Sequence, residues 1–129
     1  MKIIVFGKDE LSERQKELIR KYLNNELSGI HEIQYIYKLG MVEKEDIENL
    51  HPREECYEND MDENCIDFVV LEYDISWVIL ELLKRGIKVL GFMTARSING
   101  DGDLFDGRVK TIGLVTYEPY YRKITMVVD

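Results

Sequence analysis

The chain has 129 residues, of which 45% are hydrophobic and 33% are charged, and its formal net charge is −8 at pH 7. This size and balance predict one globular domain with a continuous core, and they exclude an intrinsically disordered chain. The most apolar stretch, residues 75–83, is interrupted by Glu81, and residues 1–6 are too short for a signal-peptide core. We therefore expect no membrane partner and a cytoplasmic location.

The negative charge is concentrated in one segment. Residues 43–67 contain eleven acidic and two basic side chains, which leaves 14 acidic and 15 basic side chains elsewhere. Without a basic stripe to contact phosphates, duplex nucleic acid is not an expected partner, whereas a local pocket remains compatible with a compact anion. We interpret residues 1–129 as a single domain that carries an acidic variable insert at about residues 43–65.

The first predicted unit is a strand, a turn and a helix. Residues 3–6 form an apolar run typical of a buried parallel strand, and residues 7–10 turn the chain. Ser12 is expected to begin a helix, with Gln15 completing a capping box. The apolar face of this helix carries Leu11, Leu18, Ile19, Tyr22 and Leu23.

The middle of the chain predicts one strand, one short helix and a loop. Residues 33–39 alternate between apolar and polar side chains, which predicts a strand with one firmly buried face. Tyr35 and Tyr37 belong to that face, where sheet packing is favoured over stacking on a ligand base. A short helix is expected over residues 43–50, and residues 51–64 show no periodicity and predict a mobile, solvated loop.

The two cysteines fall within or beside this loop. Cys56 and Cys65 form no CxxC pair, and His31 and His51 are not spaced to complete a zinc site with them. We interpret both cysteines as solvated thiols.

The second half predicts a central strand, a helix, a further strand and a hairpin. Residues 66–71 are apolar on both faces, and a helix over residues 76–85 is apolar almost all round and so expected to be deeply packed. Residues 87–93 form the next strand, and the span 108–128 predicts an antiparallel hairpin. The predicted fold class is therefore α/β, with a Rossmann-like open, mostly parallel sheet flanked by helices and a C-terminal hairpin at its edge.

Polar side chains follow the predicted strands at the points where the strands end. In an open α/β sheet, ligands bind outside the carboxyl ends of the strands, where helix N-termini present free N–H groups. The turns bring to this edge Lys8, Asp9, Asp74, Ser76, Thr94, Arg96 and Ser97. The acids and hydroxyls among them have an alternative role as helix caps and turn formers.

Familiar ligand motifs are absent from the sequence. Gly7 stands alone, so neither a dinucleotide-binding fingerprint nor a Walker loop is present. Residues 99–103 have the spacing of calcium-loop ligands, but Leu104 replaces the required glycine. Glu72 and Asp74 have no evident third carboxylate, so we expect no metal and no cofactor.

The end of the fourth predicted strand, Met93-Thr94-Ala95-Arg96, resembles the corresponding strand of response-regulator receiver domains. Glu72 stands where the phosphorylated aspartate of such a domain would be, and the paired acids after the first strand are missing. This resemblance implies an inactive receiver-like domain that docks a protein partner through its hairpin edge or its acidic segment.

A second pattern covers most of the chain. Its segments are Ile3 to Ser12 before a charged helix, Ile33 to Tyr37, Asp67 to Asp74 before an apolar helix, Gly86 to Leu90 before Thr94 and Arg96, Asp106 to Val109, and the aromatic–basic run Tyr120 to Lys123. In this order the chain resembles the small CRISPR-associated proteins with a CARF-type fold. These proteins include the stand-alone ring nucleases, which degrade cyclic oligoadenylate messengers.

This resemblance implies a homodimer whose paired strand ends hold a cyclic oligoadenylate and cleave it by metal-independent transphosphorylation. It implies catalytic roles for Lys8, Ser76 and Arg96. It implies ligand binding by Gly7, Asp9, Asp74, Thr94, Ser97 and Arg122, with Arg122 closing the pocket. The alternatives are a CARF-like module that senses a nucleotide without chemistry and the inactive receiver-like domain.

Overall fold

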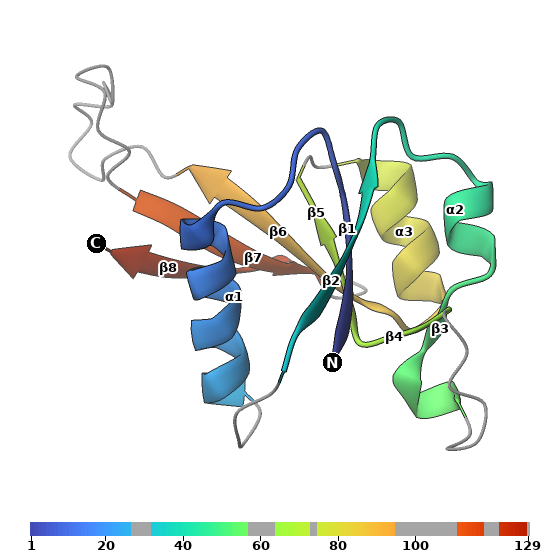
Figure 1. The fold of residues 1–129 in the computed structure, drawn as a ribbon, viewed down its shortest axis with the longest axis horizontal. Helices are drawn as coiled ribbons and strands as arrows, with labels where there is room; N and C mark the ends of the chain where they lie inside the picture. Colours follow the sequence, from blue (N-terminus) through green and yellow to red (C-terminus); the bar gives the residue numbers. More distant parts are fainter. Residues whose placement is uncertain (27–31, 57–63, 73–74, 95–110, 118–121, 129) are drawn as a thin grey trace.

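Six strands form a single sheet with helices on both of its faces (Figure 1). The structure, a computed structural model, describes residues 1–26, 32–56, 64–72, 75–94, 111–117 and 122–128. In chain order its elements are β1 (Lys2–Gly7), α1 (Glu13–Glu26), β2 (Gln34–Leu39), α2 (Glu45–Glu48), β3 (His51–Pro52), a 3₁₀ turn (Arg53–Glu55), β4 (Cys65–Ile66), β5 (Phe68–Leu71), α3 (Ser76–Lys84), β6 (Lys88–Thr94), β7 (Thr111–Tyr117) and β8 (Arg122–Val128). The predicted α/β class is confirmed.

The strand order in this sheet is β2-β1-β5-β6-β7-β8. The first four of these strands are parallel, whereas β7 pairs antiparallel with both β6 and β8. The C-terminal antiparallel hairpin at one edge of a mostly parallel sheet is therefore confirmed. β5 lies between two strands and all four of its residues are buried, which explains why its sequence is apolar on both faces.

Two apolar cores lie on opposite faces of the sheet. On one face, α1 packs Ile19 and Leu23 against Ile3 and Val5 of β1. On the other face, α2 and α3 pack against the intervening residues of β1 and β5. The buried residues of this second core are Ile4, Phe6, Val42, Ile47, Leu50, Ile66, Val69, Leu71, Val78, Ile79, Leu82, Ile87 and Val89.

α1 begins where the sequence predicts. The Ser12 hydroxyl accepts a hydrogen bond from the Gln15 N–H at 3.1 Å, and the Gln15 side-chain oxygen accepts one from the Ser12 N–H at 2.9 Å. This reciprocal pair is the predicted capping box. It supplies partners for two N–H groups at the start of the helix, so residues close in sequence fix where α1 begins.

Two elements are less buried than the sequence predicts. β2 is an edge strand in which Tyr35 and Tyr37 are half-buried and Leu39 is 53% exposed, so the prediction of a firmly buried face is wrong. α3 buries the side that faces the sheet, but Trp77 and Leu80 are 44% and 54% exposed, so it is not packed all round. Among the described elements, β2 has one strand neighbour, and the one-turn α2 is the helix that packs beside α3. No described helix is both long and apolar enough to cross a bilayer.

The segment predicted to be a solvated loop is folded where the structure describes it. The predicted short helix appears as α2, which buries Ile47, and the two-residue strands β3 and β4 pair in parallel. Cys56 and Cys65 form a disulfide and Cys65 is 2% exposed, so the interpretation as solvated thiols is wrong. Residues 57–63 of the predicted loop lie outside the described residues. Hydrophobic periodicity could not reveal this pairing, because a disulfide is a contact between residues with no common repeat.

Asp67 divides the third predicted strand into β4 and β5. Its carboxylate accepts a hydrogen bond from the Lys2 N–H at 2.8 Å and pairs with the Arg53 guanidinium at 2.8 Å. The Asp67 N–H in turn donates to the Lys2 carbonyl at 2.9 Å. This one acid therefore joins the beginning of β1 to the folded part of the acidic segment.

Candidate functional site at the carboxyl edge of the sheet

The direction of the chain connections reverses between β1 and β5. β1 is followed by α1 and β2 on one side, whereas β5 is followed by α3 and β6 on the other side (Figure 1). At such a reversal the two outgoing turns diverge, and ligands of open α/β sheets bind in the crevice outside the strand ends. The two turns that leave the sheet at this reversal begin at Gly7 and Glu72.

The Glu72 side chain lies against the turn that follows β1. Its Oε2 atom accepts hydrogen bonds from the main-chain N–H of Lys8 and, at 3.3 Å, from that of Asp9. Gly7 is buried beneath it, and a Cβ atom added to Gly7 would lie 2.7 Å from the Glu72 Cβ. Only glycine permits this approach. Two consecutive amides thus converge on one anionic oxygen, as in the backbone nests that bind anions.

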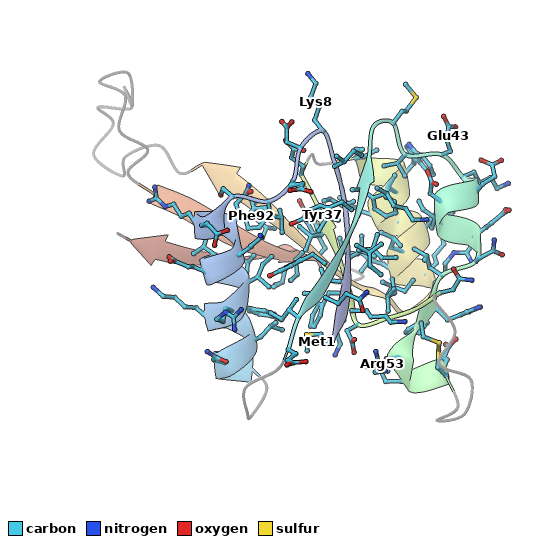
Figure 2. All side chains as sticks on the ribbon, in the orientation of Figure 1. Met1, Lys8, Tyr37, Glu43, Arg53 and Phe92 are labelled. Carbon is cyan, nitrogen blue, oxygen red and sulfur yellow. A yellow bond between two sulfur atoms is a disulfide. The ribbon has the colours of Figure 1, made fainter. Side chains whose placement is uncertain are left out.

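Three predicted site residues lie at this edge with exposed side chains. Lys8, labelled in Figure 2, follows β1. Asp9 comes directly after it, and Ser76 begins α3. The alternative role as helix caps does not apply to Asp9 or Ser76. Ser12 caps α1, and the residue before α3 is Ile75, which makes no side-chain cap bond.

Other predicted site residues cannot be placed by their side chains. Thr94 ends β6 at the same edge, where its backbone is in register with Ile112. Asp74, Arg96 and Ser97 lie outside the described residues. The described structure therefore brings Gly7, Lys8, Asp9 and Ser76 to the carboxyl edge and leaves the surroundings of these four others open.

Arg122 lies at the end of the sheet where the parallel strands begin, and Lys8 lies at the end where they finish. It is in register with Tyr117, which is in register with Val89 near the beginning of β6. β8 therefore begins where the parallel strands begin, because β7 reverses the direction between β6 and β8. The backbone of Arg122 therefore lies at the end of the sheet away from Lys8, and its role in closing a ligand pocket stays a prediction.

Tyr35 and Tyr37 pack on the sheet. Both are partly buried against the core on the α1 side, and their ring centroids are 6.3 Å apart. Burial raises the pKa of the Tyr35 hydroxyl above its ordinary value of 10.0, and the nearby Arg20 charge opposes this only in part. The favoured interpretation, in which these rings fill a sheet face, is confirmed.

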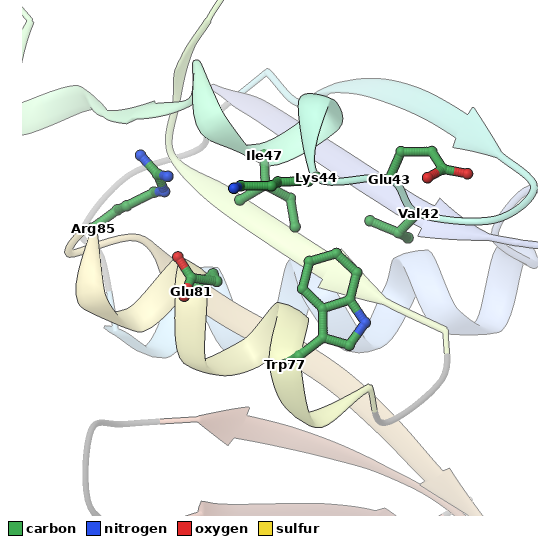
Figure 3. Close-up of a pocket in the computed structure, with 7 residues that line it drawn as sticks. All are labelled: Val42, Glu43, Lys44, Ile47, Trp77, Glu81 and Arg85. Carbon is green, nitrogen blue, oxygen red and sulfur yellow. The ribbon is translucent and has the colours of Figure 1, made fainter.

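A groove of about 540 Å³ lies between α2 and α3 (Figure 3). The residues that line it are Val42, Glu43, Lys44, Ile47, Trp77, Glu81 and Arg85. None of them is a predicted site residue. Within the described ranges, no three His, Cys, Asp or Glu side chains gather closely enough to hold a metal ion.

Glu72 is the residue that sequence reasoning left out of the site. In the sequence it stands out only as half of a carboxylate pair and as the counterpart of a phosphorylated aspartate. The detectable signal was an acid directly after the central strand beside a lone glycine at the end of the first strand. β1 and β5 are in register from Ile3 to Phe6, so Gly7 and Glu72 follow paired residues.

Comparisons with protein-family models, with curated proteins and with solved structures find no match to this chain.

Proposed function

We propose that the protein binds a nucleotide at the carboxyl edge of a Rossmann-like sheet, and that this nucleotide is a cyclic oligoadenylate. The observation that carries the proposal is the reversal of connections between β1 and β5, because nucleotides bind at this point in doubly wound sheets. Lys8, exposed in the first turn, supplies a cation for a phosphate. The resemblance to CARF-type ring nucleases supplies the identity of the ligand.

The proposed reaction is a transphosphorylation that consumes no water. The 2′-oxygen of one ribose forms a bond to the adjacent phosphorus while the bond from phosphorus to the 5′-oxygen breaks. The proton of the 2′-hydroxyl passes to the leaving 5′-oxygen, which gives a linear product that ends in a 2′,3′-cyclic phosphate. Holding the hydroxyl in line with the leaving oxygen can lower the barrier by about 7–11 kcal/mol, and fixed donors stabilise the phosphoryl charge.

In this proposal Lys8 and Arg96 bind the phosphoryl oxygens, and Ser76 orients the phosphate or ribose. Asp74, Thr94 and Ser97 complete the contacts to the ring from the neighbouring turns. Two copies of the chain bring their carboxyl edges together around one ring, because a cyclic oligonucleotide presents the same groups repeatedly around its circumference.

The test incubates the purified protein with cyclic tri-, tetra- and hexa-adenylate in the presence of EDTA and resolves the products by mass. Linear fragments with a 2′,3′-cyclic phosphate are expected, and Lys8→Ala should reduce both binding and cleavage by at least about ten-fold, the effect of losing a charged hydrogen bond. Lys21→Ala is the matched control, since it removes the same charge from an exposed position on α1.

Each result of this experiment has a definite meaning. Tight binding without cleavage would replace the enzyme by a nucleotide sensor of the same architecture. An equal effect of Lys8→Ala and Lys21→Ala would place the ligand away from the first turn. No binding of any ring would remove the cyclic oligoadenylate proposal.

The second candidate function is a protein-interaction domain, and the exposed side of α3 favours it. Trp77 and Leu80 are large apolar side chains that stay exposed there, and contiguous exposed apolar side chains mark docking sites more often than scattered ones do. Replacing residues 43–67 with a neutral linker is not a clean test, because Ile47 and Ile66 belong to the core. A pull-down that compares the wild type with Trp77→Gln/Leu80→Gln is cleaner. A partner lost with this variant at both low and high salt would favour docking.

A further inference from the structure

We infer that Glu72 is a specificity-determining residue, which accepts a hydrogen bond from a ligand hydroxyl and so selects ribose over deoxyribose. This inference rests on the proposed function, because it assigns the part of the nucleotide that faces the turn after β5. Glu72 was not among the residues that the resemblance implicates.

The contacts of Glu72 hold one of its carboxylate oxygens and leave the other available. Oε2 accepts the N–H groups of both Lys8 and Asp9, and the side chain is packed on the bare Cα of Gly7. No described residue donates a hydrogen bond to Oε1. The residue is only partly buried. A carboxylate can accept about four hydrogen bonds, so Oε1 is a fixed, reachable acceptor at the reversal point.

The charge of Glu72 decides which ligand group can lie beside it. A phosphate oxygen placed there would meet a second negative charge and could offer no proton, so it is repelled. The amides of Lys8 and Asp9, which could have bound that phosphate, are already occupied. A group with an O–H bond satisfies Oε1, and hydrogen bonds from a hydroxyl to a carboxylate are short and strong.

The pairing of an acceptor with a neighbouring cation matches one part of a ribonucleotide. Glu72 Oε1 offers an acceptor, and the exposed Lys8 ammonium belongs to the turn that Glu72 contacts. In a ribonucleotide chain the 2′-hydroxyl lies directly beside the 3′-phosphate. When the ligand's 2′-hydroxyl donates to Glu72 and its 3′-phosphate contacts Lys8, both ligand groups have a partner. This arrangement holds the 2′-hydroxyl in a defined place.

The experiment compares cyclic tetra-adenylate with its fully 2′-deoxy counterpart on the wild type, Glu72→Gln and Glu10→Gln. Binding is read by stopped-flow fluorescence in EDTA during the first seconds after mixing. The wild type should bind the ribose ring at least about ten-fold more tightly, and Glu72→Gln should reduce this ratio to within about three-fold. Glu10→Gln removes the same charge from the turn after β1, which Glu72 contacts, and it should keep the wild-type ratio.

Glu72→Gln can keep the fold, because its amide oxygen can accept the same two N–H groups, and its thermal midpoint checks this. Failure of both rings to bind would remove the proposed function together with this inference. Binding of both rings with no preference for ribose in the wild type would overturn the inference alone, whatever the variants do. An unchanged ratio in Glu72→Gln would also overturn it and leave the proposed function intact.

Discussion

α1 and the segment from Val42 to Asp67 pack on opposite faces of the same sheet, but different kinds of contact hold them in place. α1 depends on neighbours in sequence, namely a capping box at its start and an apolar stripe along one side. The segment 42–67 depends on distant partners, among them a disulfide, the ion pair between Arg53 and Asp67, and single apolar side chains inserted into the core. The comparison shows that a segment without periodicity can still be an integral part of a fold.

The strongest test of this comparison removes one buried isoleucine from each region. Ile19 in α1 is fully buried and Ile47 in α2 is 2% exposed. Ile19→Ala and Ile47→Ala should each lower the free energy of unfolding by about 2–5 kcal/mol, the range for large-to-small substitutions in well-packed cores. Chemical denaturation measures both values under one set of conditions.

The outcome for Ile47 decides whether the acidic segment is structural. A loss close to that of Ile19 would make the two regions equal parts of the core. A loss below about 0.5 kcal/mol, typical of surface substitutions, would show that the segment is peripheral and that its net negative charge is its main property.

The disulfide should contribute the next largest effect. Cys56 and Cys65 are nine residues apart, and closing a loop of this length in the unfolded chain corresponds to about 2–3 kcal/mol in the chain-entropy model. Cys56→Ser should lower the free energy of unfolding by about this amount, and a reducing agent should do the same to the wild type. The reductant should have no further effect on Cys56→Ser.

Thiol titration of the native protein gives an independent check on the same bond. Two reactive thiols without denaturant would contradict the pairing. The result also bears on the predicted cytoplasmic location, because disulfides persist mainly in oxidising compartments and most cytoplasmic thiols are kept reduced.

The parts of the fold that the sequence predicted are those with a repeating hydrophobic pattern or with capping residues at the end of a helix. Ser12 and Gln15 predicted the start of α1. Gly86, which has a positive φ of 76°, predicted the end of α3. The exposure of Leu39 and Trp77 was not predictable in this way. Their apolar character is the same as that of core residues, and their exposure follows from the arrangement of the described elements around them.

The sequence predicted where the candidate site lies better than it predicted which residues form it. Parallel strands bring their carboxyl ends to one edge, so Lys8 and Ser76 could be assigned to that edge from the order of elements alone. The position of Arg122 depends on the register of two antiparallel pairings, which the sequence does not state. Glu72 was missed because its contact with the turn requires a glycine on a different strand.

A smaller effect is expected from the ion pair that anchors the acidic segment. Asp67 is mostly buried and accepts from both the Lys2 N–H and Arg53, so Asp67→Asn should cost about 1–2 kcal/mol of unfolding free energy. Glu54→Gln is the matched control, because Glu54 pairs with Lys88 at 3.7 Å on the surface and exposed pairs contribute less than about 1 kcal/mol. Equal effects of the two variants would mean that Asp67 is not an anchor, and that the segment is held by its apolar contacts and the disulfide.

The smallest predicted effect separates two serines that stand at the beginnings of helices. Ser12→Ala removes the side-chain half of the capping box and should cost about 1 kcal/mol, as N-cap substitutions usually do. Ser76→Ala should cost less than about 0.5 kcal/mol, because Ser76 is the first residue inside α3 and is exposed. Urea denaturation of the two variants gives the difference directly. A larger loss of unfolding free energy for Ser76→Ala would show that the Ser76 hydroxyl supports the turn after β5. Ser76 would then be a structural residue and not one that is available to a ligand. The expected order instead assigns Ser12 to the locally determined helix and leaves Ser76 available at the carboxyl edge.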